Sequence, residues 1–168
     1  MILRKENKAP NECIMNAVEI IEYEDQYQPI FKALNVEWLD QYNLTEKHDL
    51  QILDAPREMI LNAGGFIYLA KCNNQIVGST AIMKEHDGVY ELAKMTVAKD
   101  FRKMGISKKL MDRCKAKAIE LKATRITLYS NHQLKAALAL YEQYGFKHIP
   151  IENSPFLTAD VMMELKLE

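Results

Sequence analysis

The stretch from residue 65 to residue 97 constrains the fold more than any other part of the chain. It contains three apolar, β-branched segments, "GFIYLAKC", "IVGSTAIMKEH" and "VYELAKMTV", separated only by "NNQ" and "DG". Connections this short join antiparallel neighbours, so the stretch predicts a three-stranded meander. The apolar spacing then becomes that of an amphipathic helix, with Ile106, Leu110, Cys114, Ala118 and Leu121 on one face.

The flanking segments extend this pattern into an α/β fold. A strand is predicted around 17–23, followed by a helix with Asp25 in the N-cap position, a second helix that stops at Pro56, and a third turn. After the long helix come the strand "TRITLYS", the helix "NHQLKAALALYEQY" and the closing strands "GFKHI" and "DVMMELKL". A helix separates the meander from "TRITLYS", so these two strands must pair in parallel. We expect a mixed, mostly antiparallel sheet flanked by helices.

Length and composition favour one ordinary globular domain. The chain has 168 residues and a formal net charge of −1, and we divide it into an N-terminal arm (1–16) and a single domain (17–168). The charge gives no support to nucleic-acid or membrane-surface binding, and no run approaches the ~20 apolar residues of a membrane span. The three cysteines lie far apart and in no metal-ligand spacing, which predicts reduced thiols in a cytoplasmic protein. The scattered histidines predict no metal site, and the charged N-terminus predicts no signal peptide.

Positive charge gathers in "DFRKMGISKKLMDRC", where five basic residues surround Gly105. A strand ending at Val97, a short loop and a helix starting near Gly105 would leave free backbone N–H groups at the start of that helix. Such groups and the helix dipole favour an anion. On these residues alone, the segment is either an anion site or a solvated helix face.

Two longer motifs resemble the GNAT superfamily of acetyl-CoA-dependent N-acetyltransferases. In "KMTVAKDFRKMGISKKLM", Arg102 and Gly105 match the acyl-CoA signature Gln/Arg-x-x-Gly-x-Gly/Ala, with Ser107 where glycine or alanine is usual. In "LYSNHQLKAALALYEQYGF", the strand, the asparagine and the ending "LYExxGF" of the family follow about thirty residues later. The resemblance covers roughly 18–167 and implies the GNAT acyl-CoA N-acyltransferase fold.

The resemblance implies that acetyl-CoA is the acyl donor. Its pyrophosphate would lie on the backbone amides of 103–108, and its pantetheine arm would run beside the strand that ends at Val97. One nearby lysine would meet the 3′-phosphate, although the sequence does not indicate which. The implied contacts are Met95, Val97, Arg102, Lys103, Met104, Gly105, Ile106, Ser107, Lys108, Asn131 and Ala137. From its residues alone, Asn131 could equally cap a helix that begins at the next positions.

The resemblance also implies two catalytic side chains. Glu91 lies six residues before Val97, where histone-type members carry a general base; otherwise it is a strand residue that faces solvent or pairs with Lys94. Tyr141, in the "LYExxGF" motif, would protonate the leaving thiolate; otherwise it is a core tyrosine on an amphipathic helix. The backbone N–H of Val97 would polarise the thioester carbonyl.

The expected function is transfer of an acetyl group from acetyl-CoA to a primary amine, directly within a ternary complex. The alternative is a non-catalytic domain that binds or senses acyl-CoA. The acceptor region would involve Phe31, Asn35, Trp38 and Tyr42, with Glu37, Glu46, His48 and Asp49 nearby. These polar groups either attract a cationic amine or form an exposed helix face. Family members commonly dimerise through the late strands, so a homodimer is one expected state.

Overall fold

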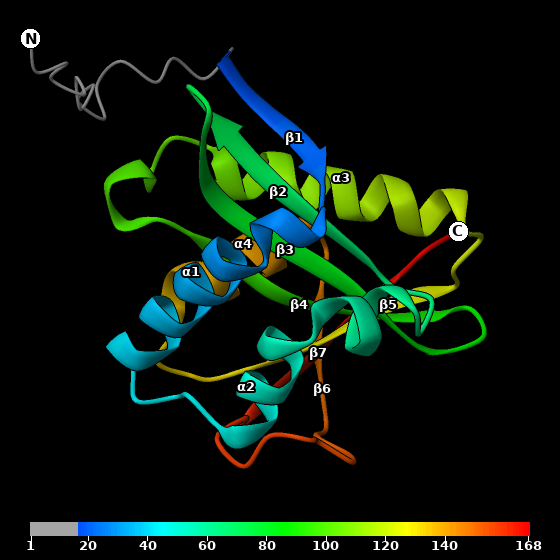
Figure 1. Ribbon diagram of the computed structural model, residues 1–168. Coiled ribbons are helices and arrows are strands. Elements are labelled where there is room, and N and C mark those ends of the chain that lie inside the picture. Colours follow the sequence, from blue (N-terminus) through cyan, green and yellow to red (C-terminus); the bar gives the residue numbers. More distant parts are fainter. Residues whose placement is uncertain (1–16) are drawn as a thin grey trace, which may run out of the picture.

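The computed structural model describes residues 17–168, so the N-terminal arm of residues 1–16 lies outside the described residues. A single sheet has the strand order β1-β2-β3-β4-β5-β7-β6 (Figure 1). Its strands are β1 (Val18–Glu22), β2 (Phe66–Cys72), β3 (Gln75–His86), β4 (Val89–Val97), β5 (Arg125–Ser130), β6 (Lys147–Ile149) and β7 (Val161–Lys166). Strands β4 and β5 pair in parallel, and the other neighbours pair antiparallel. The predicted mixed sheet is confirmed.

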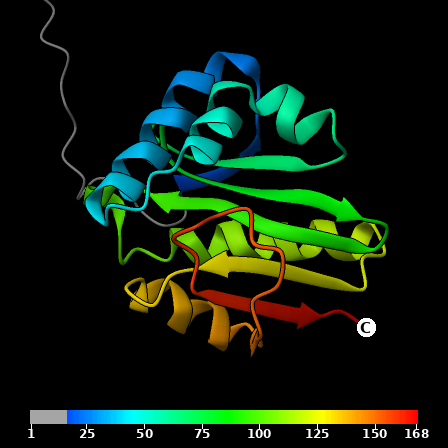
Figure 2. The same ribbon diagram turned by 90° about the horizontal axis from the view of Figure 1, so that it is seen from below.

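Helices cover both faces of this sheet. They are α1 (Gln28–Gln41), α2 (Lys47–Asp54), α3 (Ile106–Glu120) and α4 (Lys135–Gln143). Figure 2 shows α1 and α2 on one side of the strands and α3 and α4 on the other. Along β2, Ile67 and Leu69 join the cluster beneath α1 and α2, whereas Tyr68 and Ala70 join the cluster beneath α3. This alternation follows from the two-residue period of a strand that is buried on both faces.

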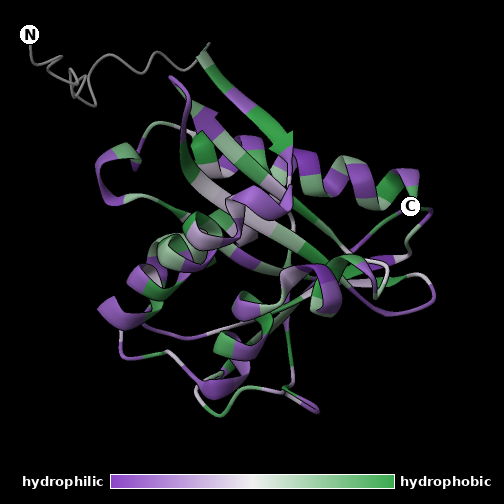
Figure 3. Ribbon diagram, viewed as in Figure 1, coloured by the Kyte–Doolittle hydropathy of each residue, from purple (hydrophilic) through white to green (hydrophobic). Residues whose placement is uncertain are grey.

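Helix α3 is amphipathic. Figure 3 shows hydrophilic and hydrophobic bands alternating along α3. On the inner face of α3, the predicted residues Ile106, Leu110, Cys114 and Ala118 are all buried at 1% exposure or less. The amphipathic spacing in the sequence therefore identified the packed face of this helix correctly.

Two expected helix starts were wrong. Asp25 begins a short 3-10 turn, and α1 starts at Gln28 without a side-chain cap. The Asp25 carboxylate instead accepts hydrogen bonds of 2.8 and 2.9 Å from Nε of Arg57. Helix α4 starts at Lys135, because Asn131 caps the preceding turn by accepting a bond from the Gln133 backbone N–H at 3.0 Å. For Asp25, a contact with a residue 32 positions away displaced the local signal, whereas Asn131 caps a turn instead of the helix.

The cysteines also differ from expectation. Cys114 is a free, buried thiol, as expected of a core residue, and burial raises its pKa to about 12. Cys72 is disulfide-bonded, so the expectation of reduced cysteines was wrong for this residue. Cys72 lies opposite Val18 in the β1–β2 ladder, beside the first described residues, a position that distances along the sequence could not show. Cys13 lies outside the described residues.

A buried ion pair joins α2 to β4. Between Ala93 and Thr96, β4 has one more residue than the facing part of β3, and Lys94 in this bulge has a left-handed φ of 53°. Its ammonium lies 2.6 Å from Oδ1 of Asp49, and the two side chains are only 6% and 5% exposed. Asp49 completes a capping box at the start of α2, so one carboxylate serves both the helix and the ion pair.

We expect Asp49→Ala to lower the free energy of unfolding by about 3–5 kcal/mol, because it leaves a buried ammonium without its partner. The control is Asp54→Ala, which removes a carboxylate paired with Lys32 at the surface and should cost about 0–1 kcal/mol. Urea unfolding followed by circular dichroism measures both. Equal losses in the two variants would show that burial of the Lys94–Asp49 pair has no energetic consequence.

Candidate functional site

The site lies where β4 parts from β5. Their parallel ladder covers only Val89–Glu91 on β4 and Arg125–Thr127 on β5. Beyond it, β4 stays paired with β3 and β5 stays paired with β7, so the carboxyl ends of the two strands diverge. Two adjoining hollows occupy this wedge: a groove of about 640 Å³ and an inner cavity of about 110 Å³. Ligands of open α/β sheets bind in such gaps between strand ends.

The groove brings together most of the residues expected to bind the cofactor. Those that line it are Met95, Val97, Arg102, Lys103, Gly105, Ile106, Ser107, Lys108 and Ala137. Met104 packs against the hydrophobic core instead, and Asn131 lines the inner cavity. Sequence reasoning missed several further lining residues, among them Phe101 and Lys135. Lys135 opens α4, and no motif singled it out.

The loop before α3 turns sharply at two left-handed residues. Lys103 has φ 61° and Gly105 has φ 77°, and Gly105 directly precedes the first residue of α3. This geometry places the unpaired N–H groups of the first helical turn at the border of the groove, where they suit an anion. The cations of Lys103 and Lys108 line the same groove. Glycine suits position 105 because, without a Cβ, it adopts this φ at no steric cost.

Arg102 supports the end of β4 from within the groove. Its Nε donates to the Val97 carbonyl at 3.0 Å, and its terminal nitrogen donates to Oε1 of Gln41 at 3.3 Å. The guanidinium therefore ties the loop to β4 and to the last turn of α1. Its position is compatible with the cofactor role that the resemblance implies, and it adds a structural role that the motif did not indicate.

The inner cavity collects part of the expected acceptor region. Asn35, Trp38 and Asp49 line it, whereas Tyr42 lines the groove. Phe31 is fully buried in the core beneath α1. Asp49 is 3% exposed, so the reading of this residue as part of an exposed helix face was wrong. Its burial follows from the pairing with Lys94, which the separation of the two residues in sequence concealed.

Glu91 lines the inner cavity at the point where β4 leaves β5. Burial, and after it the nearby Glu85 carboxylate, raise the pKa of Glu91 to about 7, against the lowering effect of Lys94. The Lys94 ammonium bonds Asp49 rather than Glu91. Glu91 is therefore a partly buried carboxyl that changes charge near neutral pH, which is the property required of a general base.

Tyr141 stands between the two hollows, because it lines both of them. It comes from α4 and packs at 5.9 Å against the ring of Phe146. Burial raises the pKa of its phenol to about 12, so the hydroxyl keeps its proton at any physiological pH. Tyr141 is thus a packed residue with a protonated hydroxyl, and it lines both hollows.

Asn131 and His132 hydrogen-bond the segment that forms one side of the inner cavity. The side-chain amide of Asn131 donates to the Thr158 carbonyl at 2.7 Å. The backbone N–H of His132 donates to Asp160 at 2.8 Å, and the exposed His132 ring also bonds that carboxylate. Asn131 therefore caps a turn and holds the loop between β6 and β7.

That loop is a further part of the site that sequence reasoning missed. Phe156, Thr158 and Ala159 line the inner cavity, and the Phe156 ring lies 5.2 Å from the Lys94 ammonium. The segment "IENSPFLTAD" has no apolar periodicity and no motif, so only the fold could bring it to the site.

Among residues 17–168, no group of three histidine, cysteine, aspartate or glutamate residues is arranged to hold a metal ion. None of the helices described there has the length and apolarity to cross a bilayer.

Known proteins with this sequence pattern and fold are acetyltransferases. The model of the acetyltransferase (GNAT) family matches residues 26–146. A GNAT-family acetyltransferase from Staphylococcus aureus Mu50 has a TM-score of 0.83 and 25% identity, over 90% of this chain and 100% of that one. An acetyltransferase from Streptococcus agalactiae 2603 has a TM-score of 0.78 and 22% identity, over 90% and 99%.

A Thermoplasma acidophilum PaiA N-acetyltransferase in complex with coenzyme A has a TM-score of 0.70 and 15% identity, over 89% and 99%. No curated protein is similar enough to match. The family model covers well over half of the sequence, and the structures share the sheet and helices described above. The chain therefore belongs to the GNAT acetyltransferase family.

Proposed function

We propose that this protein transfers an acetyl group from acetyl-CoA to a primary amine, with donor and acceptor bound together. One observation carries the proposal: Tyr141 lines both the groove and the inner cavity, and Glu91 also lines the inner cavity. A donor in the groove and an amine in the cavity would meet at Tyr141. Membership of the GNAT family supports the reaction class.

The groove fits the donor in size and in chemistry. Its volume of about 640 Å³ lies within the range of cofactor sites. The first turn of α3 and the side chains of Lys103, Lys108 and Lys135 border it and suit phosphate groups. The coenzyme A complex of the Thermoplasma protein supports this assignment. When bound, acetyl-CoA supplies the activated acetyl group and a thiolate leaving group.

Glu91 prepares the acceptor. A primary amine with a pKa near ~10.4 is mostly protonated at neutral pH and cannot react in that form. The Glu91 carboxylate takes one of its protons, directly or through water, and a base with a pKa of about 7 is well matched to neutral pH. Since the pKa of Glu91 lies well above that of an exposed glutamate, it accepts a proton more readily.

Tyr141 provides the proton that the leaving thiolate of coenzyme A takes up. Its hydroxyl stays protonated because burial raises its pKa to about 12, so it is available to the departing sulfur. The backbone N–H of Val97, at the end of β4 and on the wall of the groove, is proposed to polarise the acetyl carbonyl. Neither role requires a cysteine nucleophile, and Cys114 is buried in the core.

We expect Lys108→Glu to weaken acetyl-CoA binding by about tenfold or more, because it reverses a charge at the groove. Lys122→Glu makes the same change on an exposed residue beyond the other end of α3 and should leave affinity within about twofold. Calorimetric titration with acetyl-CoA measures both. Folded wild-type protein that does not bind acetyl-CoA contradicts the proposal. Binding without CoA release in the presence of any amine indicates the non-catalytic acyl-CoA-binding domain instead.

We expect acetyl transfer to accelerate as pH rises through about 7. Glu91 accepts a proton only as the carboxylate, and its pKa of about 7 means that it is protonated and inactive below that pH. Glu91→Gln should lose this inflection in the plot of kcat/KM against pH, measured by CoA thiol release. Tyr141→Phe is the control: kcat should fall by about a hundredfold or more while the inflection stays. An inflection that persists in Glu91→Gln assigns the base to another group.

A further inference from the structure

The loop between β6 and β7 closes one side of the inner cavity, although little side-chain packing holds it there. Phe156, Thr158 and Ala159 line the cavity. Leu157 lies between them with its side chain 97% exposed, so it contributes no packing. Asn131 and His132 hold the loop on the β5 side through Thr158 and Asp160. On the α2 side, the anchor is Glu46.

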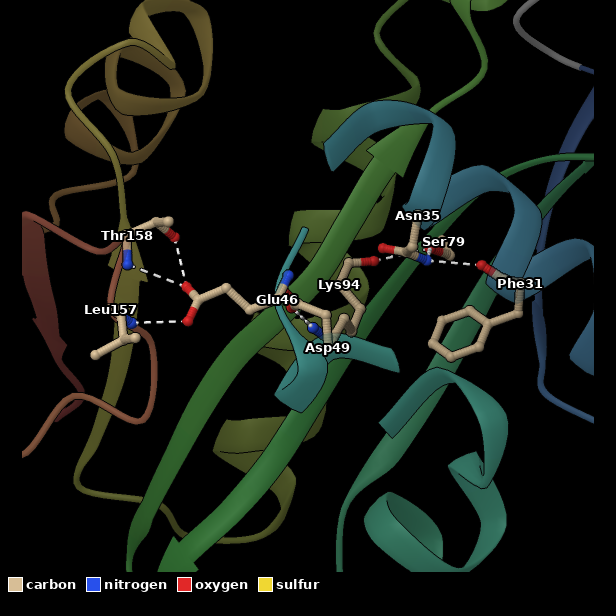
Figure 4. Close-up of polar contacts among 8 residues, drawn as sticks. All are labelled: Phe31, Asn35, Glu46, Asp49, Ser79, Lys94, Leu157 and Thr158. Atoms are coloured by element: carbon tan, nitrogen blue, oxygen red, sulfur yellow. Dashed lines mark hydrogen bonds and ion pairs between the residues drawn. The ribbon is translucent and has the colours of Figure 1, made fainter. Parts of the chain in front are cut away.

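The Glu46 carboxylate binds this loop through three hydrogen bonds. The backbone N–H of Leu157 donates at 2.9 Å, the backbone N–H of Thr158 at 3.0 Å, and the Thr158 hydroxyl at 2.6 Å. Figure 4 shows the carboxylate extending from the start of α2 to meet these groups. Two adjacent N–H groups and a hydroxyl that converge on one carboxylate form a charge-assisted contact.

Glu46 is also the last member of a polar network that crosses the site (Figure 4). Its backbone N–H donates at 3.0 Å to Asp49, whose other oxygen accepts from Lys94. The Lys94 carbonyl accepts from Ser79 at 2.8 Å, and Ser79 accepts from Asn35 of α1 at 3.0 Å. The bulge in β4, the start of α2 and the loop are therefore fixed relative to one another.

The charge state of Glu46 suits this contact. Burial raises the pKa of its carboxyl, but the hydrogen bonds from Thr158 and Leu157 and the charge of His48 outweigh burial, so that this pKa is lowered overall. The His48 ring lies 5.1 Å from that of Phe156, so the neighbour of Glu46 on α2 also contacts the loop.

We propose that Glu46 is a positioning residue for the acceptor: it tethers Leu157 and Thr158 and thereby fixes Phe156 and Thr158 as a wall of the inner cavity. This inference rests on the proposed function, because it assigns the inner cavity to the amine. The tether lies on the cavity side of the site, and Glu46 does not line the groove. Its loss should therefore affect the acceptor and spare acetyl-CoA.

The test variant is Glu46→Ser. Serine is a favoured N-cap residue and keeps the start of α2, but it is too short to reach the loop. Glu58→Ser makes the same substitution at an exposed position after α2 and serves as the control. Thr158→Val removes one of the three bonds without changing α2 and should give a smaller effect in the same direction.

The first readout is amide hydrogen exchange, followed by NMR. Exchange of the Leu157 and Thr158 amides should rise by about tenfold or more in Glu46→Ser, while the amides of β4 and β5 exchange as in wild type. Glu58→Ser should leave all of these rates unchanged. Equal protection of the two loop amides in Glu46→Ser and wild type overturns the proposal.

The second readout is CoA release with tyramine, spermidine or an alanine-initiated peptide as the acceptor probe. In Glu46→Ser the KM for the probe that wild type uses should rise by about tenfold, with the KM for acetyl-CoA within about twofold. An unchanged acceptor KM, or an equal rise in both values, overturns the positioning role. If wild type binds acetyl-CoA but uses none of the three probes, the proposed function fails. In that case only the hydrogen exchange rates test whether Glu46 holds Leu157 and Thr158 in place.

Discussion

The site depends on the change of partner that occurs along β4. Up to Glu91 this strand hydrogen-bonds to both neighbours, and after Glu91 it keeps only β3. The bulge at Lys94 accompanies this change, and the wedge that follows contains both the groove and the inner cavity. A regular ladder between β4 and β5 would fill this space with backbone. Lys94 in the bulge and its partner Asp49 both line the inner cavity that opens in this wedge.

The features that sequence reasoning predicted are those with local signals. The meander, the long helix and its buried face follow from periodicity, and the turn at Gly105 follows from the glycine between a strand and a helix. Glu91 and Tyr141 were identified by their places in motifs, and the fold brings both to the inner cavity. The roles proposed for them are supported by the pKa values and positions described above, together with the family resemblance.

The features that it missed depend on contacts between distant residues. Asp25 bonds Arg57 instead of capping a helix, and Lys94 bonds Asp49, which lies 45 residues earlier. Glu46 meets the β6–β7 loop more than one hundred residues further along the chain. In each case the side chain has an ordinary local role available, and only the tertiary fold decides which partner it takes. Polar side chains whose partners lie far away in the sequence are thus the least predictable part of such a site.

The pairing of Lys94 with Asp49 has a consequence for the electrostatics of the inner cavity. Because these two charges compensate each other, the net charge of its ionisable lining groups is set by Glu91. The cavity is nearly neutral while Glu91 is protonated and carries one negative charge once pH exceeds about 7. An ammonium group is attracted to the charged form, which is also the form able to remove its proton. As pH rises through about 7, binding of a cationic acceptor and removal of its proton would thus both become more favourable. An acidic acceptor would be repelled under the same conditions.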